Sequence, residues 1–185
     1  MKTNINTKSS IYFLLLLVSL LGLLGLGQGG GLTSARVMPE FTNNNSAEWF
    51  NSKPLKRADL KGKVVLLDVW TYGCWNCYRS FPWLNELEAR FSSHNFQVIG
   101  IHTPEFGHEK LARNVAEKIK KFKLHHPVMM DNDFAYWKAL GNRYWPSFYI
   151  IDKQGQIRFT HVGETHAGDR NARHIEAEIR QLLAE

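Results

Sequence analysis

An unbroken apolar run that ends at a closely spaced cysteine pair constrains this chain most. Residues 64–70 are apolar except for Asp68, and Cys74 and Cys77 follow after a three-residue segment. Such a run predicts a strand buried on both faces, as in a parallel or mixed sheet. Apolar residues three and four positions apart then predict a helix over 74–91. The sequence therefore predicts a buried strand that delivers two cysteines to the start of a helix.

The spacing of Cys74 and Cys77 suits reversible disulfide chemistry. Residues three apart on a helix face one another at about 5–6 Å, which is within reach of a disulfide. The partial positive charge at a helix N-terminus favours a thiolate and lowers a cysteine pKa from about 8.5 toward roughly 3.5–7.5. These are the only two cysteines in the chain. We therefore expect Cys74 to be the attacking thiolate and Cys77 the resolving thiol of a redox site.

Two other uses of a cysteine pair are a structural disulfide and a zinc site. In the chain-entropy model a disulfide that closes about four residues contributes roughly 2 kcal/mol, against nearly 5 for a loop of about a hundred. A purely structural disulfide is thus a poor use of this spacing. Two cysteines also supply only half of a tetrahedral zinc site, and no histidine pair follows at zinc-finger spacing. We expect no metal and no cofactor other than the redox-active disulfide itself.

The first 35 residues read as an export leader. They contain Lys2 and Lys8 and no acidic residue, followed by an apolar run over 11–26. A run of about sixteen residues is long for a signal-peptide core and slightly short for a membrane span, so a cleaved signal peptide and an uncleaved anchor both remain open. Small residues suit cleavage after Ala35, and the absence of a nearby cysteine excludes a lipoprotein anchor. Both alternatives predict a periplasmic or other extracytoplasmic location, secreted or membrane-anchored.

Charge and composition limit the function classes and the domain organisation. The leader carries two lysines and no acids, so its removal lowers the formal charge from +6 to +4. No basic cluster with interleaved aromatic residues is found, so nucleic-acid binding has no support. We expect residues 1–35 to be the leader, residues 36–46 a polar, Asn-rich tether and residues 47–185 a single domain, which is long enough to bury a core.

Asp68 is the one charged residue in the apolar run. A buried carboxyl without a partner is costly and has a raised pKa. Six residues before Cys74, it would lie beneath the dithiol, where a proton acceptor for Cys77 is needed. The alternative is a carboxyl at the strand edge that is hydrogen-bonded to backbone.

The rest of the chain predicts an α/β fold with a mixed sheet flanked by helices. A short packing segment or edge strand is expected over 47–55, with further strands over 96–101, 125–129, 147–151 and 156–162 and helices over 110–123, 134–140 and 169–183. The last two strands, separated by an Asp-Lys-Gln-Gly turn, predict a hairpin.

Several motifs together resemble the thioredoxin fold and, more closely, its periplasmic TlpA-like branch, in particular the thioredoxin-like domain of DipZ-type proteins. The resemblance covers residues 49–164 and is carried by Asp68-Val69-Trp70, Cys74-x-x-Cys77, Pro82, Val69–Cys74, Gly100–Phe106, Asp131–Asp133 and Asn142–Pro146. It implies a cis peptide bond at Trp145-Pro146, opposite the dithiol. There Pro146 would exclude metal and shape a groove, and the backbone of Trp145 would pair with an incoming chain. A trans proline at an edge strand is the alternative.

Aromatic residues near the dithiol are candidates for substrate binding. Trp70 is expected in the core, whereas Trp75, between the cysteines and beside Asn76, and Trp145 are expected at the rim of a docking site. Tyr72 and Tyr144 suit the rim and the core about equally.

By resemblance, the loop after the second strand lies on the active-site side. Glu105, Glu109 and His102 are then expected to form an acidic or polar fringe near the dithiol.

The resemblance implies a thiol–disulfide oxidoreductase that reduces protein disulfides through a mixed-disulfide intermediate. It also implies a membrane electron donor of the DsbD or CcdA type, and we expect a monomer. Relatives that act in cytochrome maturation often carry Glu three residues after the second cysteine, where this chain has Ser80. The client protein therefore stays open.

Three alternative functions remain open. The first is a disulfide-donating oxidant of the same fold. The second is a thiol peroxidase of the peroxiredoxin type, because Thr71-x-x-Cys74 matches part of that pattern, although Leu67 stands where a proline is expected. The third is an exported chaperone or docking module, whose activity would survive loss of both thiols.

Overall fold

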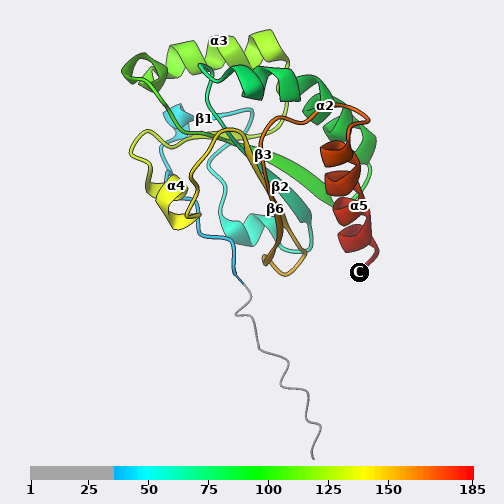
Figure 1. Ribbon diagram of the computed structural model, residues 1–185. Helices are drawn as coiled ribbons and strands as arrows, with labels where there is room; N and C mark the ends of the chain where they lie inside the picture. Colours follow the sequence, from blue (N-terminus) through cyan, green and yellow to red (C-terminus); the bar gives the residue numbers. More distant parts are fainter. Residues whose placement is uncertain (1–35) are drawn as a thin grey trace, which may run out of the picture. The chain divides into compact units, whose positions relative to one another are not determined.

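In the computed structural model, which describes residues 36–185, a six-stranded mixed sheet carries helices on both faces (Figure 1). The strands lie in the order β1-β4-β3-β2-β5-β6. Their bounds are Trp49–Phe50 (β1), Val64–Trp70 (β2), Phe96–His102 (β3), Val128–Met130 (β4), Ser147–Ile151 (β5) and Ile157–Val162 (β6). The predicted fold class is confirmed for this part of the chain.

Four α-helices and three short 3-10 helices connect the strands in the described residues. The α-helices are Trp75–Phe91 (α2), Ala112–Phe122 (α3), Ala135–Ala139 (α4) and Arg170–Ala184 (α5), and the 3-10 helices are Ser46–Glu48 (η1), Arg57–Leu60 (η2) and Gly107–Lys110 (η3). Within residues 36–185 no helix is long and apolar enough to cross a membrane. The predicted leader lies outside the described residues.

Strand β2 is the centre of the sheet. It runs parallel to β3 and antiparallel to β5, and all seven of its residues are buried. Because side chains alternate along a strand, Val64, Leu66 and Trp70 face one core, and the odd-numbered residues face the other. This double burial explains why the strand reads as a continuous apolar run.

The two faces of the sheet have different covers. Helices α2, α3 and α5 pack on the first core, and Cys77 is one of the residues that α2 buries there. Helix α4 and the segment that precedes β2 cover the second face, with Met38, Leu60 and Tyr136 among its buried side chains. Figure 1 shows α2, α3 and α5 apart from α4. The dithiol therefore belongs to the three-helix face.

Most predicted elements are present, with shifted ends. The strands predicted over 64–70 and 147–151 have those bounds. The helix predicted from 110 begins at Ala112, because Leu111 is extended and separates α3 from η3. Strand β4 starts only at Val128, after Pro127, which has no N–H to donate to a ladder.

The segment 36–46 differs from the expected tether, because it packs on the domain. Val37 forms an antiparallel bridge with Gln156, and Met38 is 1% exposed. The Asn43 side chain donates to the carbonyl oxygen of Met130 at 2.9 Å. The polar composition of the segment concealed one buried methionine and one long-range hydrogen bond.

Candidate active site

Cys74 and Cys77 form a disulfide at the start of α2, with their Cα atoms 5.3 Å apart. Cys74 is the N-cap residue, and its Sγ accepts a hydrogen bond from the Cys77 N–H at 3.2 Å. Helix N-termini leave several N–H groups without intrahelical partners, and these favour negative charge on a nearby atom. The N-cap position therefore suits a thiolate on Cys74.

The two cysteines differ in exposure. Cys74 is partly exposed, whereas Cys77 is completely buried. Trp75 and Asn76, between them, are both exposed, and Trp75 is 68% exposed. A partner's disulfide can therefore approach Cys74, while Cys77 can be reached only through Cys74.

Asp68 lies on the face of β2 that α2 covers. It has the same strand parity as Leu66 and Trp70, which share the first core with Cys77. Asp68 is 1% exposed, and its Oδ2 has no hydrogen-bond partner. Burial raises the pKa of this carboxyl from 3.8 to about 8. Asp68 is therefore a buried acid that titrates in the range of a thiol, and not a carboxyl paired at a strand edge.

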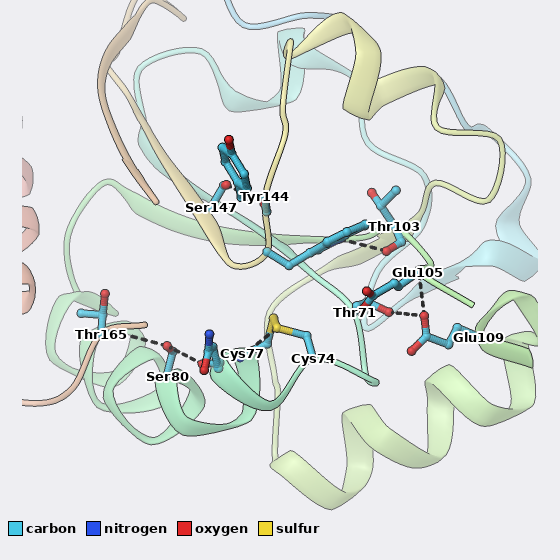
Figure 2. Close-up of a disulfide and its surroundings, with 12 residues drawn as sticks. Thr71, Cys74, Cys77, Ser80, Thr103, Glu105, Glu109, Tyr144, Ser147 and Thr165 are labelled. Atoms are coloured by element: carbon cyan, nitrogen blue, oxygen red, sulfur yellow. Dashed lines mark hydrogen bonds between the residues drawn. A yellow bond between two sulfur atoms is a disulfide. The ribbon is translucent and has the colours of Figure 1, made fainter. Parts of the chain in front are cut away.

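The Trp145-Pro146 peptide bond is cis, as expected from the resemblance. Pro146 is buried directly before β5, whose first residue, Ser147, pairs with Val69 near the end of β2. This register brings Pro146 to the edge of the sheet from which the segment to Cys74 departs. Figure 2 shows Tyr144 and Ser147, which flank this bond, across from the dithiol.

The structure separates the four candidate aromatic residues into two groups. Trp75 and Tyr144 are exposed, the latter by 60%. Trp145 is partly buried, and its indole N–H donates to the carbonyl oxygen of Thr103 at 3.1 Å. Tyr72 is only 6% exposed, and its hydroxyl donates to the carbonyl oxygen of His108 at 2.8 Å. The sequence leaves Tyr72 open between the rim and the core, and in the structure it belongs to the first core.

The loop after β3 does lie near the dithiol, but its side chains point in different directions. Glu105 is exposed, whereas Glu109 and His102 are completely buried. Figure 2 shows Thr71, Glu105 and Glu109 on the same side of Cys74. Burial lowers the pKa of His102 to about 4, and its ring packs against Trp70 at 4.8 Å between centroids. His102 is therefore a neutral core residue, and not part of an exposed fringe.

Ser80 has a structural partner in this chain. Its hydroxyl donates to the carbonyl oxygen of Asn76 and accepts a hydrogen bond from the backbone N–H of Thr165 at 3.0 Å (Figure 2). The side chain thereby joins the first turns of α2 to the loop before α5. Ser80 therefore connects two elements of the fold.

The sequence assigns no role to Phe106 and expects Glu109 in a polar fringe, whereas the structure places both side chains beside Gly73. Phe106 is 52% exposed and lies against Gly73, and Glu109 is buried beside the same glycine. Glu109 follows Phe106 by three residues and accepts from its N–H, the spacing of a helix-capping acid. That spacing was the one feature of the sequence that could have predicted the capping role of Glu109.

One cavity lies away from the dithiol. It measures about 650 Å³ and is lined by residues from the segment before β2 and from the β5–β6 turn, including Met38, Leu60 and Gly155. Among the described residues, no group of three or more His, Cys, Asp or Glu is arranged to hold a metal.

Comparisons with known proteins point to the same chemistry. Residues 34–178 match the Redoxin family. Protein DipZ from Mycobacterium tuberculosis is 40% identical over 138 residues, which cover 73% of this chain and 19% of DipZ. The chain thus spans under a fifth of that relative. Thiol-disulfide oxidoreductase YkuV from Bacillus subtilis is 26% identical and matches over 80% of this chain and 95% of its own length.

A solved structure supports the fold. The crystal structure of a thioredoxin-like superfamily protein superposes with a TM-score of 0.72 at 28% identity, covering 82% of this chain and 98% of the other. The dithiol, the buried acid and the cis proline of this chain therefore lie on a thioredoxin-like scaffold.

Proposed function

Because this chain belongs to the Redoxin family, we propose that it is an exported oxidoreductase that uses Cys74 and Cys77 to reduce disulfides in other proteins. The general activity, thiol–disulfide exchange, is named for YkuV, a relative that matches this chain over nearly its whole length. Exchange needs only the two cysteines. One observation carries the proposal: a partly exposed N-cap Cys74 is bonded to a completely buried Cys77.

The reaction begins with the reduced dithiol. The Cys74 thiolate attacks one sulfur of the substrate disulfide, that S–S bond breaks, and the departing substrate sulfur takes up a proton. A mixed disulfide now joins Cys74 to the substrate. Cys77 then loses its proton and attacks Cys74 Sγ, which releases the second substrate sulfur as a thiol. The substrate gains two electrons and two protons, and the chain holds the Cys74–Cys77 disulfide.

Asp68 is the proton acceptor that we assign to Cys77. It lies on the same face of β2 as Leu66 and Trp70, which share a core with Cys77, and burial raises its pKa to about 8. An acceptor whose pKa is close to that of a thiol, about 8.5, can take and return the proton with little energetic cost. No other ionisable side chain of β2 faces this core.

Substrate binding is assigned to the exposed residues around Cys74. Trp75, Asn76 and Tyr144 offer an apolar and hydrogen-bonding rim, and Glu105 adds an exposed acid from the loop after β3. The backbone beside Trp145 and Pro146 pairs with an extended segment of the substrate, in the manner of strand addition. Tyr72 contributes indirectly, by fixing the loop that contains His108.

After each turnover the disulfide must be reduced again. In an exported compartment the electrons have to cross the membrane, so we assign a membrane donor of the DsbD or CcdA type. Residues 1–35 are the segment that would direct export, by cleavage or as an anchor over 11–26. We propose that the exported domain acts as a monomer.

The direction of electron flow is tested by equilibration with glutathione. Couples of this fold range from about −270 mV for thioredoxin to about −120 mV for the oxidant DsbA. We expect the dithiol to lie toward the reducing end, measured by trapping free thiols with a mass tag at a series of glutathione ratios. A value near the oxidising end would contradict the reductant proposal and support the disulfide-donating alternative.

A further inference from the structure

Glu109 is a completely buried acid in η3, beside the dithiol, and the exchange reaction described above does not use it. One of its oxygens, Oε2, accepts three hydrogen bonds: from the Thr71 hydroxyl at 2.8 Å, from the Glu105 N–H at 2.6 Å and from the Phe106 N–H at 2.9 Å. The carboxylate thereby connects the end of β2 to the loop after β3. These contacts fix its position.

The other oxygen, Oε1, is buried without a hydrogen-bond partner and lies against Gly73. A Cβ added at Gly73 would overlap this oxygen, so the residue directly before Cys74 has to be glycine as long as Glu109 keeps its place. A Cβ at Gly73 would also touch the Phe106 ring. The carboxylate is thus held against the backbone at the N-terminus of α2.

The charge of Glu109 acts on the groups around it. His102 faces it from β3: burial lowers the pKa of this histidine, and the carboxylate opposes that effect. Tyr78 faces it from α2, where burial raises the phenol pKa and the carboxylate raises it further, as does Tyr72. The Lys118 ammonium of α3 lies 5.4 Å from the centre of the Tyr72 ring. Tyr78 is one helical turn beyond Cys74, so the field of Glu109 extends to the start of α2.

The negative charge of Glu109 and the N-terminus of α2 have opposite effects on the stability of the Cys74 thiolate. The N–H groups of the first turn favour a thiolate on Cys74, whereas a carboxylate behind Gly73 disfavours it. A dithiol whose reduced form is stabilised is an oxidant, as in DsbA, and one whose thiolate is less stabilised is a stronger reductant.

We propose that Glu109 is a positioning residue that holds the segment from Thr71 to Gly73 behind Cys74 and sets the reducing strength of the dithiol through its negative charge. The inference rests on the proposed function in one respect, the assignment of Cys74 as the attacking thiol.

The test is the variant Glu109→Gln, which keeps the shape and the accepting oxygen and removes the charge. We expect its equilibrium with glutathione to shift toward the dithiol by about threefold to tenfold, or roughly 15–30 mV at about 30 mV per tenfold change. The Cys74 thiolate, followed by its ultraviolet absorbance, should also form at lower pH. Glu86→Gln, an exposed acid on α2, is the matched control and should change neither quantity. An unchanged equilibrium in a folded Glu109→Gln protein would overturn the proposal.

A second test uses the unaltered chain and therefore does not depend on whether Glu109→Gln folds. In reduced protein labelled with ¹³C, the carboxyl carbon of Glu109 should shift over the pH range in which Cys74 titrates, and no response would overturn the inference. If Cys77 forms the thiolate before Cys74, the proposed function fails. If Cys74 titrates first but Glu109→Gln leaves its titration unchanged, only the role of Glu109 fails.

Discussion

At the scale of single residues, Asp68 shows how one buried group can link stability to chemistry. Its pKa is about 8 in the folded chain and about 3.9 in an unfolded one. Between these values the native state holds a proton that the unfolded state has released. The free energy of unfolding therefore falls as pH rises from about 4 to about 8. Below pH 4 the carboxyl is protonated in both states, so Asp68 no longer makes stability depend on pH.

We expect Asp68→Asn to be more stable than the parent chain at neutral pH. The gain should be absent near pH 4 and grow toward pH 8, by at most about 1.4 kcal/mol per pH unit and roughly 5 kcal/mol in all. Urea unfolding of the oxidised proteins at several pH values measures it, with the exposed Glu117→Gln on α3 as control. A gain that does not depend on pH would contradict the raised pKa.

The same variant tests the role of Asp68 in proton transfer. In the parent chain, release of the mixed disulfide should speed up as pH rises through about 8, and in Asp68→Asn this rise should be lost. Stability and release rate thus change for one physical reason, the burial of an unpaired carboxyl.

At the scale of elements, the start of α2 gives the two cysteines different exposure to solvent. Cys74 is the N-cap and partly exposed, while Cys77, one turn later, faces the first core. Because a helix places residues three apart on one face, the pair can bond while only one member meets solvent. The hydrogen bond from Thr165 to Ser80 holds the same turns against the loop before α5.

We expect Cys77→Ser to accumulate a mixed disulfide with protein substrates and Cys74→Ser to accumulate none, because the buried Cys77 cannot reach an incoming disulfide. Non-reducing electrophoresis and mass spectrometry of captured partners measure this in the exported compartment, with the double variant as control. Capture by Cys74→Ser alone would show that the assigned roles are reversed. Activity that survives in the double variant would favour the chaperone alternative.

At the scale of the whole molecule, three separate segments place exposed apolar residues around Cys74. Trp75 comes from the start of α2, Phe106 from the loop after β3 and Tyr144 from the loop before β5. The order of the central strands, β3-β2-β5, brings these segments to one edge of the sheet. Exposed aromatic residues grouped in this way are typical of protein-binding surfaces.

We expect Trp75→Ala and Tyr144→Ala each to lower kcat/KM for protein disulfides by about fivefold or more, the effect of roughly 1 kcal/mol of lost contact. For the small molecule glutathione disulfide, kcat/KM of each variant should stay within about twofold of the parent value, because a small substrate does not contact the aromatic residues around Cys74. Val37→Ala is a suitable control, since Val37 is also exposed but pairs with Gln156 at the far end of β6. Equal losses on both substrates would instead indicate a damaged dithiol.

Local sequence was sufficient for the central parts of this protein. The apolar run of β2 and the cysteine spacing predicted the strand and the cysteine pair, because each depends on residues close together in the chain. The cis bond at Pro146 was predicted from the resemblance of its motif to the thioredoxin family. The expected positions of Asp68 and Cys77 also follow from strand and helix periodicity alone.

Tertiary structure decided what depends on distant contacts. Tyr72 is buried because its hydroxyl meets His108, and residues 36–46 pack because Met38 enters the second core. Glu109 lies behind Gly73 only because β3 runs parallel to β2 and returns its loop to the same edge of the sheet. The sequence by itself thus determined which two cysteines form the pair, whereas only the fold decided which charges and aromatic rings surround them, because those neighbours are assembled from segments about 30 to 70 residues apart.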